Sequence, residues 1–333
     1  MCCLFGMIDF HQRFSAAEKT RILSVLATAC EARGTDATGV AYNAGGRLRI
    51  YKRPVAAHEL NLRIPSEARV IMGHTRMTTQ GAAKKHHNNH PFRGSLPKCQ
   101  FALAHNGVLH NDFTLRRELE LPKTKIETDS YIAVQLIEQK KTLDTDSLRY
   151  MAEQVRGSFT FTVLDDRDQL YFVKGTNPLC LYYFPEQDIY LYASTKEILE
   201  KGLGAAGLLK LPREQISIDE GEILCVAPDG TASRAGFTMQ EEFRYWYHPH
   251  CYRIGTPEPI RQNHYRDQLL DFGQQLGISY QELTWLELMD VDDDELEMAL
   301  FDDDFRREVL LSGGFFEDLE EDDFHACSVY SMW

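Results

Sequence analysis

The sequence predicts an α+β fold in which antiparallel sheets are covered by helices. Within the first 236 residues, four pairs of short segments with apolar alternation flank turn residues, which is typical of antiparallel hairpins. Three other stretches repeat apolar residues at intervals of three or four, which predicts amphipathic helices. Helices and hairpins mixed along one chain indicate the α+β class.

The elements are expected in a definite order. A helix is expected first, over 17–32, where Ile22, Val25, Leu26 and Ala29 share one face. Each hairpin is recognised by its Gly, Pro or Asp turn. The paired strands are 39–43 with 48–52, 159–164 with 170–175, 179–184 with 189–194, and 222–227 with 231–236.

Two more helices and two more strands are expected between these hairpins. The strands VIMGHTR (70–76) and FALAHNG (101–107) end in polar tripeptides, and catalytic groups often lie at such places on a sheet scaffold. Both helices follow the strand 101–107, one directly after the other. Their inward residues are Ile132, Leu136 and Ile137 in the first and Leu148, Met151 and Val155 in the second.

Composition and charge limit the possible functions. The 333 residues are 43% hydrophobic, enough for a substantial core, and no apolar run of about 18 residues predicts a membrane span. We therefore expect a cytoplasmic location. The eight cysteines show neither a disulfide framework nor CxxC spacing. The net charge of −14 is concentrated between residues 287 and 323, where 17 acidic residues stand against two arginines. Such an acidic segment disfavours nucleic acid and membrane partners.

Five short strings occur in order over about 130 residues: MCCLFG, RGTDATG at 33–39, GHTRMTTQG at 73–81, HNGVLHN at 105–111 and ETDS at 127–130. Together they resemble the class II glutamine amidotransferases, the N-terminal nucleophile family that feeds ammonia to synthases. The resemblance covers residues 1–236, and NPLCLYY, YASTKEIL and GEILCVAPDG match the family's closing strands. It implies a four-layer αββα sandwich of two antiparallel sheets.

The resemblance makes Cys2 the nucleophile once Met1 is removed. A thiol attacks as thiolate and has an ordinary pKa of about 8.5, so it needs a nearby base. The α-amine, with a pKa of about 7.7 to 8.0, can supply one. The alternative for Cys2 is a disordered chain end without a role. The family usually carries Gly in place of Cys3, for which we favour a packed bystander over a vicinal disulfide partner or a second reactive thiol.

The resemblance also implies the groups that bind glutamine. Arg76 would hold the α-carboxylate and Asp129 the α-ammonium, while Thr78 and Thr79 would line the pocket. The alternatives are a surface arginine and a helix cap at Asp129.

In the family, the oxyanion is bound by donors that correspond to the Asn106 side chain and the Gly107 N–H. The alternative is an ordinary Asn-Gly hairpin turn. His105 beside them, and Arg33 and Asp36 in the second string, are expected to support the site. We expect no cofactor and no metal, because the cluster of His86, His87 and His90 overlaps NNHPF, which matches a substrate-side loop of the family.

The C-terminal part is expected to contain a linker over 237–263 and a helical, acidic segment over 264–333. LLSGGFFED (310–318) and DVDDDE (290–295) begin like a phosphate loop and a calcium loop, but neither is complete. This part is too short for a synthase. We therefore expect ammonia to pass to a separate synthase that docks on the acidic segment, and a solvated appendage is the alternative.

The sequence thus predicts an enzyme that converts L-glutamine to glutamate and ammonia through a Cys2 γ-glutamyl thioester. A non-catalytic glutamine-binding or scaffolding module with the same fold stays possible, because Cys3 and Met77 depart from the family pattern. A third possibility is an N-terminal nucleophile hydrolase that acts on another amide and does not need Asp129.

Overall fold

The computed structural model describes residues 2–239 and, beyond them, 269–270, 272–274, 276, 278–288, 291 and 293–312. The chain divides into two units, Met1–Tyr247 and His248–Trp333. The predicted domain boundaries at 236 and 263 stay predictions, and most of the expected linker lies outside the described residues.

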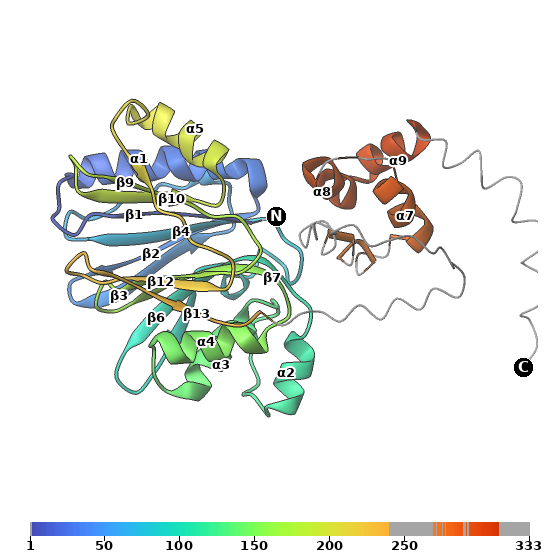
Figure 1. The fold of residues 1–333 in the computed structure, drawn as a ribbon, viewed down its shortest axis with the longest axis horizontal. Helices are drawn as coiled ribbons and strands as arrows, with labels where there is room; N and C mark the ends of the chain where they lie inside the picture. Colours follow the sequence, from blue (N-terminus) through green and yellow to red (C-terminus); the bar gives the residue numbers. More distant parts are fainter. Residues whose placement is uncertain are drawn as a thin grey trace, which may run out of the picture. The chain divides into compact units, whose positions relative to one another are not determined.

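Two antiparallel sheets form the centre of the first unit (Figure 1). The seven-stranded sheet runs β11 (Glu214–Gln215), β9 (Cys180–Phe184), β10 (Ile189–Ala193), β1 (Cys3–Ile8), β4 (Val70–Arg76), β2 (Ala37–Ala44) and β3 (Arg47–Arg53). The six-stranded sheet runs β13 (Ala232–Gly236), β12 (Glu222–Val226), β8 (Leu170–Lys174), β7 (Gly157–Asp165), β6 (Gln100–Leu109) and β5 (Phe92–Ser95).

Helices cover the outer face of each sheet. Figure 1 shows α1 (Ala16–Ala29) and α5 (Lys196–Ala206) over the seven-stranded sheet, and α3 (Tyr131–Lys140) and α4 (Thr145–Gln154) over the six-stranded sheet. The short helix α2 (Asp112–Glu118) lies beside α3. The predicted four-layer αββα sandwich is confirmed.

The structure differs from the expected elements at the first helix and at α5, and it adds α2, β5 and β11, which were not expected. The first helix is α-helical only to Ala29 and continues as a turn of 3₁₀ helix over Cys30–Arg33. The assignment of all of YASTKEIL to a strand was wrong, because α5 begins at Lys196. The Thr195 hydroxyl caps it by accepting from the Ile198 N–H at 3.3 Å, and such a cap favours a helix start.

Strand alternation on β1 assigns neighbouring residues to different layers. Cys3, Phe5 and Met7 lie in the apolar cluster beneath α1 and α5, whereas Leu4 lies in the cluster between the two sheets. On the same alternation Cys2 belongs to the side between the sheets. Cys3 is completely buried on the opposite side, which supports its interpretation as a packed bystander.

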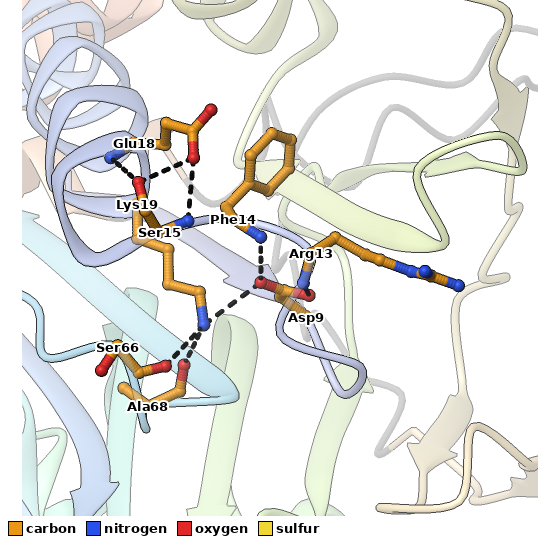
Figure 2. A network of polar contacts seen from close by, with 8 residues as sticks. All are labelled: Asp9, Arg13, Phe14, Ser15, Glu18, Lys19, Ser66 and Ala68. Carbon is orange, nitrogen blue, oxygen red and sulfur yellow. Dashed lines mark hydrogen bonds and ion pairs between the residues drawn. The ribbon is translucent and has the colours of Figure 1, made fainter.

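A buried ion pair joins α1 to the end of β1 (Figure 2). The Lys19 Nζ lies 3.1 Å from the Asp9 Oδ2, and both side chains have no exposed area. Lys19 also donates to the carbonyls of Ser66 at 3.1 Å and Ala68 at 2.7 Å. The Asp9 carboxylate accepts the backbone N–H groups of the 13–14 loop at 2.7 and 3.1 Å. Every charge in this network is therefore hydrogen-bonded, as burial requires.

The described part of the second unit contains α7 (Tyr280–Leu288), α8 (Asp293–Phe301) and α9 (Asp303–Ser312). Leucines from all three helices are buried, so the described part of the acidic tract forms helices with buried apolar residues. The last three residues of the incomplete calcium motif, 293–295, belong to α8. Among the described residues of both units, no helix combines the length and apolar character needed to cross a membrane.

Candidate active site

Cys2 immediately precedes β1, and two other segments contact it. Its carbonyl accepts from Arg33 Nε at 3.2 Å, and its Sγ donates to the Met77 carbonyl at 3.5 Å. Burial raises the pKa of the Cys2 thiol, and the positive charge of Arg76 only partly opposes this effect. The thiol therefore keeps its proton at neutral pH, so an attack on a carbonyl would need a base.

Arg76 ends β4 and is only 3% exposed, so the surface-arginine alternative is wrong. Its guanidinium donates to Asn89 Oδ1 at 2.7 Å and to the carbonyls of Gln80 at 2.5 Å and Gly81 at 2.7 Å. These bonds use three of the five guanidinium N–H groups. Counting bonds within the described residues, the Nε–H and one Nη1–H remain.

The second string holds the loop that follows Arg76. The Asp36 N–H donates to the Arg76 carbonyl at 2.9 Å, and the Asp36 carboxylate accepts from the Thr78 N–H at 2.7 Å. A Cβ at Gly34 would lie 2.5 Å from the Arg76 carbonyl carbon, so only glycine allows this approach. The buried Thr78 Oγ1 has no hydrogen-bond partner in the described part of the chain, and Thr79 next to it is half-buried.

Asn106 and Gly107 lie inside β6 and not in a turn, so the hairpin-turn alternative is wrong. Asn106 shares its strand face with Ala102 and Ala104, which lie between the sheets. Asn106 is completely buried, and neither of its amide atoms has a partner among the residues that the structure describes. A buried amide without hydrogen bonds costs stability. Both N–H donors of this side chain are available for a bound group.

Gly107 has a φ of 141°, which side-chain-bearing residues rarely adopt. A Cβ at this position would lie 2.1 Å from the Ser158 carbonyl oxygen. The backbone after Asn106 therefore requires glycine for both reasons.

Asp129 lies just before α3 but does not cap it, so the capping alternative is wrong. The N-cap residue is Ser130. The Asp129 carboxylate instead accepts from the Leu109 N–H at 2.7 Å and from the Ser130 hydroxyl at 3.2 Å. Two of its roughly four acceptor positions are thus used. Its negative charge acts on both Cys2 and Arg76, so the structure brings these three predicted residues into one electrostatic neighbourhood.

Three buried histidines lie next to these residues. The His74 ring is 4.1 Å from that of His90, whose other side meets Phe92 at 4.3 Å. The His74 Nε2 contacts the His105 carbonyl at 2.9 Å, which connects the two sheets directly behind Asn106. His90 therefore packs in an aromatic stack. In the described ranges, no three His, Cys, Asp or Glu side chains group in a way that could hold a metal ion.

These histidines make stability depend on pH. Burial lowers the pKa of all three, to about 3 for His74, whereas an unfolded chain titrates near 6.5. Below pH ~6.5 the unfolded state therefore binds more protons than the folded state. The free energy of unfolding then falls with falling pH, by up to about 1.4 kcal/mol per pH unit for each histidine.

We expect His90→Phe to weaken this acid sensitivity, since it keeps an aromatic ring in the stack without a titrating group. His74, His105, Arg76 and Lys52 all disfavour a charge at His90, so no neighbour offsets the effect. Urea unfolding at pH 7.5 and pH 5.0 measures it. The exposed His86→Gln serves as the control and should keep the wild-type pH dependence. An equal loss of stability at pH 5.0 in His90→Phe and wild type would contradict the expectation.

Two residues that support the site were missed from the sequence. Asn89 connects Arg76 to the following loop, since its Nδ2 donates to the Ala83 carbonyl at 2.7 Å. Lys52 donates to the carbonyls of Asn89 and, at 3.0 Å, Pro91, and burial lowers its pKa to about 8. Asn89 lies within the NNHPF string, which was a usable signal. The sequence gives no such signal for Lys52, because a lysine on a strand usually points to solvent.

Comparisons with known proteins agree with this arrangement. Residues 74–201 match the family model described as "Glutamine amidotransferase domain". A glutamine–fructose-6-phosphate aminotransferase (isomerizing) of Symbiobacterium thermophilum is 30% identical over 210 residues, which cover 60% of this chain and 32% of that protein. A 7-cyano-7-deazaguanine synthase of Saccharolobus solfataricus is 25% identical over 240 residues, which cover 68% of this chain and 50% of that protein.

The fold is also similar to a solved structure of glutamine phosphoribosylpyrophosphate amidotransferase from B. subtilis complexed with ADP and GMP. The TM-score is 0.57 at 20% identity, with 72% of this chain and 50% of that chain covered. The chain thus spans about a third to a half of the length of these relatives.

The sandwich of the first unit has an amidotransferase fold. More narrowly, the first unit contains a class II glutamine amidotransferase domain, as the sequence predicted. Enzymes of this class take nitrogen from the glutamine side-chain amide.

Proposed function

We propose that the chain hydrolyses L-glutamine to glutamate and ammonia, with Cys2 as the nucleophile after removal of Met1. The observation that supports this most is Asn106. It is a completely buried amide, without a partner in the described part of the chain, on the strand face that points towards the sheet carrying Cys2. An enzyme that stabilises an oxyanion needs such a donor, already oriented and free of other bonds.

The proposed reaction proceeds through a thioester on Cys2. The α-amine of Cys2 takes the proton of the thiol, which burial keeps protonated at rest, and Sγ attacks the amide carbon of glutamine. The Asn106 amide and the Gly107 N–H donate to the oxyanion. The C–N bond then breaks, the amine returns the proton to the leaving nitrogen, and ammonia departs. Water attacks the resulting thioester and releases glutamate and the free thiol.

The free amino acid would be bound by one fixed cation and one fixed anion. The remaining N–H groups of Arg76, on Nε and Nη1, are available to donate to the α-carboxylate, and the unused acceptor positions of Asp129 suit the α-ammonium. Thr78 has a buried hydroxyl at the start of the intervening loop. Transfer of the ammonia to a separate synthase, docked on the acidic C-terminal segment, stays a prediction.

The test is glutamate release from glutamine by the protein whose loss of Met1 has been verified by mass spectrometry. We expect Asn106→Ala to lower kcat by about 100- to 1,000-fold, because one oxyanion donor is removed. The exposed Asn61→Ala serves as the control and should keep the wild-type rate. Glutamine binding without any glutamate release would favour the non-catalytic module. An unchanged rate in Asn106→Ala would refute the proposed role of Asn106 as an oxyanion donor.

A further inference from the structure

Ser130 occupies a helix start but does not cap the helix. The side chains of Ser15, Asp144 and Thr195 accept from the first turn of α1, α4 and α5. Ser130, the N-cap residue of α3, has helical backbone angles (φ −55°, ψ −26°) and makes no such bond. Serine at this position normally stabilises a helix by capping it, so its hydroxyl is engaged elsewhere.

The hydroxyl of Ser130 lies between two groups of the proposed site. Its Oγ is 2.8 Å from the His105 Nδ1 and 3.2 Å from the Asp129 Oδ1. All three residues are at most 4% exposed, so water does not compete for these bonds. The other Asp129 oxygen accepts from the Leu109 N–H at 2.7 Å. The chain of bonds therefore starts and ends on β6, the strand that carries Asn106.

Counting protons assigns the direction of each bond. Burial lowers the pKa of His105, so its ring is neutral and carries one proton, and the Ser130 hydroxyl carries another. Three contacts share these two protons, because the His105 Nε2 also lies 3.3 Å from the Ser158 carbonyl. A carboxylate is the strongest of the acceptors. Ser130 therefore donates to Asp129, His105 donates from Nδ1 to Ser130, and the longest contact is left without a proton.

We propose that Ser130 is a positioning residue, which orients the Asp129 carboxylate for the α-ammonium of the substrate and holds His105 in its Nδ1–H tautomer. The first half of this role rests on the proposed function of Asp129. Ser130 thereby connects the group that recognises a free amino acid to the strand that carries the oxyanion donor. Its loss should weaken recognition of the ammonium while the nucleophile and the oxyanion donors stay in place.

The tautomer of His105 tests the hydrogen-bond assignment without any need for activity. In ¹⁵N NMR of the full chain, wild type and Ser130→Thr should show the Nδ1–H tautomer. Ser130→Ala should show the Nε2–H tautomer, because only the Ser158 carbonyl then remains as an acceptor. The same tautomer in wild type and Ser130→Ala would overturn the assignment.

Kinetics with two substrates test the role in recognition. We expect Ser130→Ala to raise the KM for glutamine about 10-fold, the size of a lost hydrogen bond to a charged group, with kcat within about two-fold of wild type. Ser130→Thr, which keeps the hydroxyl, should have a KM for glutamine close to that of wild type. With 4-carbamoylbutyrate, which is glutamine without the α-amino group, Ser130→Ala should equal wild type. Equal losses on both substrates would show a packing role and overturn the proposal.

Failure of the proposed function has a different signature. In that case wild type hydrolyses neither substrate, while the NMR comparison still decides whether Ser130 fixes the His105 tautomer. A wild type that hydrolyses glutamine, combined with an unchanged KM in Ser130→Ala, would refute the recognition role alone.

Discussion

Cys2→Ala is expected to lower glutamate release by roughly 10⁴-fold or more, because removing a nucleophile leaves only binding and oxyanion stabilisation. Among the described residues, the adjacent Cys3 is not expected to replace it. Cys3 is completely buried and lies in the cluster beneath α1 and α5, on the opposite side of the sheet. The measurement is glutamate release by the processed protein, together with mass spectrometry after reaction with an electrophilic glutamine analogue, which should label Cys2 once.

Cys3→Ala is the matched control for this experiment. It removes the adjacent thiol, and because the Cys3 side chain contacts no proposed reacting group, both glutaminase activity and the label on Cys2 should remain. A label on Cys3, or glutamate release by Cys2→Ala at the wild-type rate, would refute the proposed nucleophile.

The second large effect is on stability. Lys19→Met should lower the free energy of unfolding by about 3–5 kcal/mol, because it leaves the Asp9 carboxylate buried without its counter-ion. It also leaves the carbonyls of Ser66 and Ala68 without their donor. Urea unfolding at pH 7 measures the loss. The control is Lys201→Met, an exposed lysine on α5, for which a change within about 0.5 kcal/mol is expected.

A double variant separates charge burial from the hydrogen bonds. Asp9→Leu combined with Lys19→Met removes both buried charges, so part of the lost stability should return. Recovery should be incomplete, because Asp9 also accepts two backbone N–H groups at 2.7 and 3.1 Å. A Lys19→Met protein as stable as Lys201→Met would contradict the importance of this network.

Much of the first unit follows from local sequence patterns. The strands VIMGHTR and FALAHNG were predicted correctly, and the structure finds Arg76 buried at the end of β4 and Asn106 buried inside β6. The number of layers followed from the resemblance to a family, because hairpins alone do not specify how two sheets stack. The helices α2 and α5 were missed. In α2 only one apolar residue, Leu115, is buried, so periodicity offers little signal, and α5 was hidden by its assignment to the preceding strand.

The contacts that complete the site could not be read from the sequence, because they join distant segments. Ser130 looks like an ordinary helix cap until His105 is placed 2.8 Å from its hydroxyl. Asn89 acquires its role only because Arg76 reaches it across the sheet end. Lys19 resembles any helix lysine, and its burial depends on Asp9 and two carbonyls from another loop. Tertiary structure supplies each of these partners.

The proposed reacting groups are divided between the two sheets: Cys2 and Arg76 on one, Asn106 and Gly107 on the other. The gap between thiol and oxyanion donors is therefore set by the thickness of the layer that separates the sheets. Small side chains on β6, Ala102 and Ala104, fill that layer beside Asn106. A bulkier residue at either position would increase the distance between the two sheets, and so between the proposed nucleophile and the proposed oxyanion donors, without contacting either group. On the proposed function, the volume of the core would therefore influence the reaction rate.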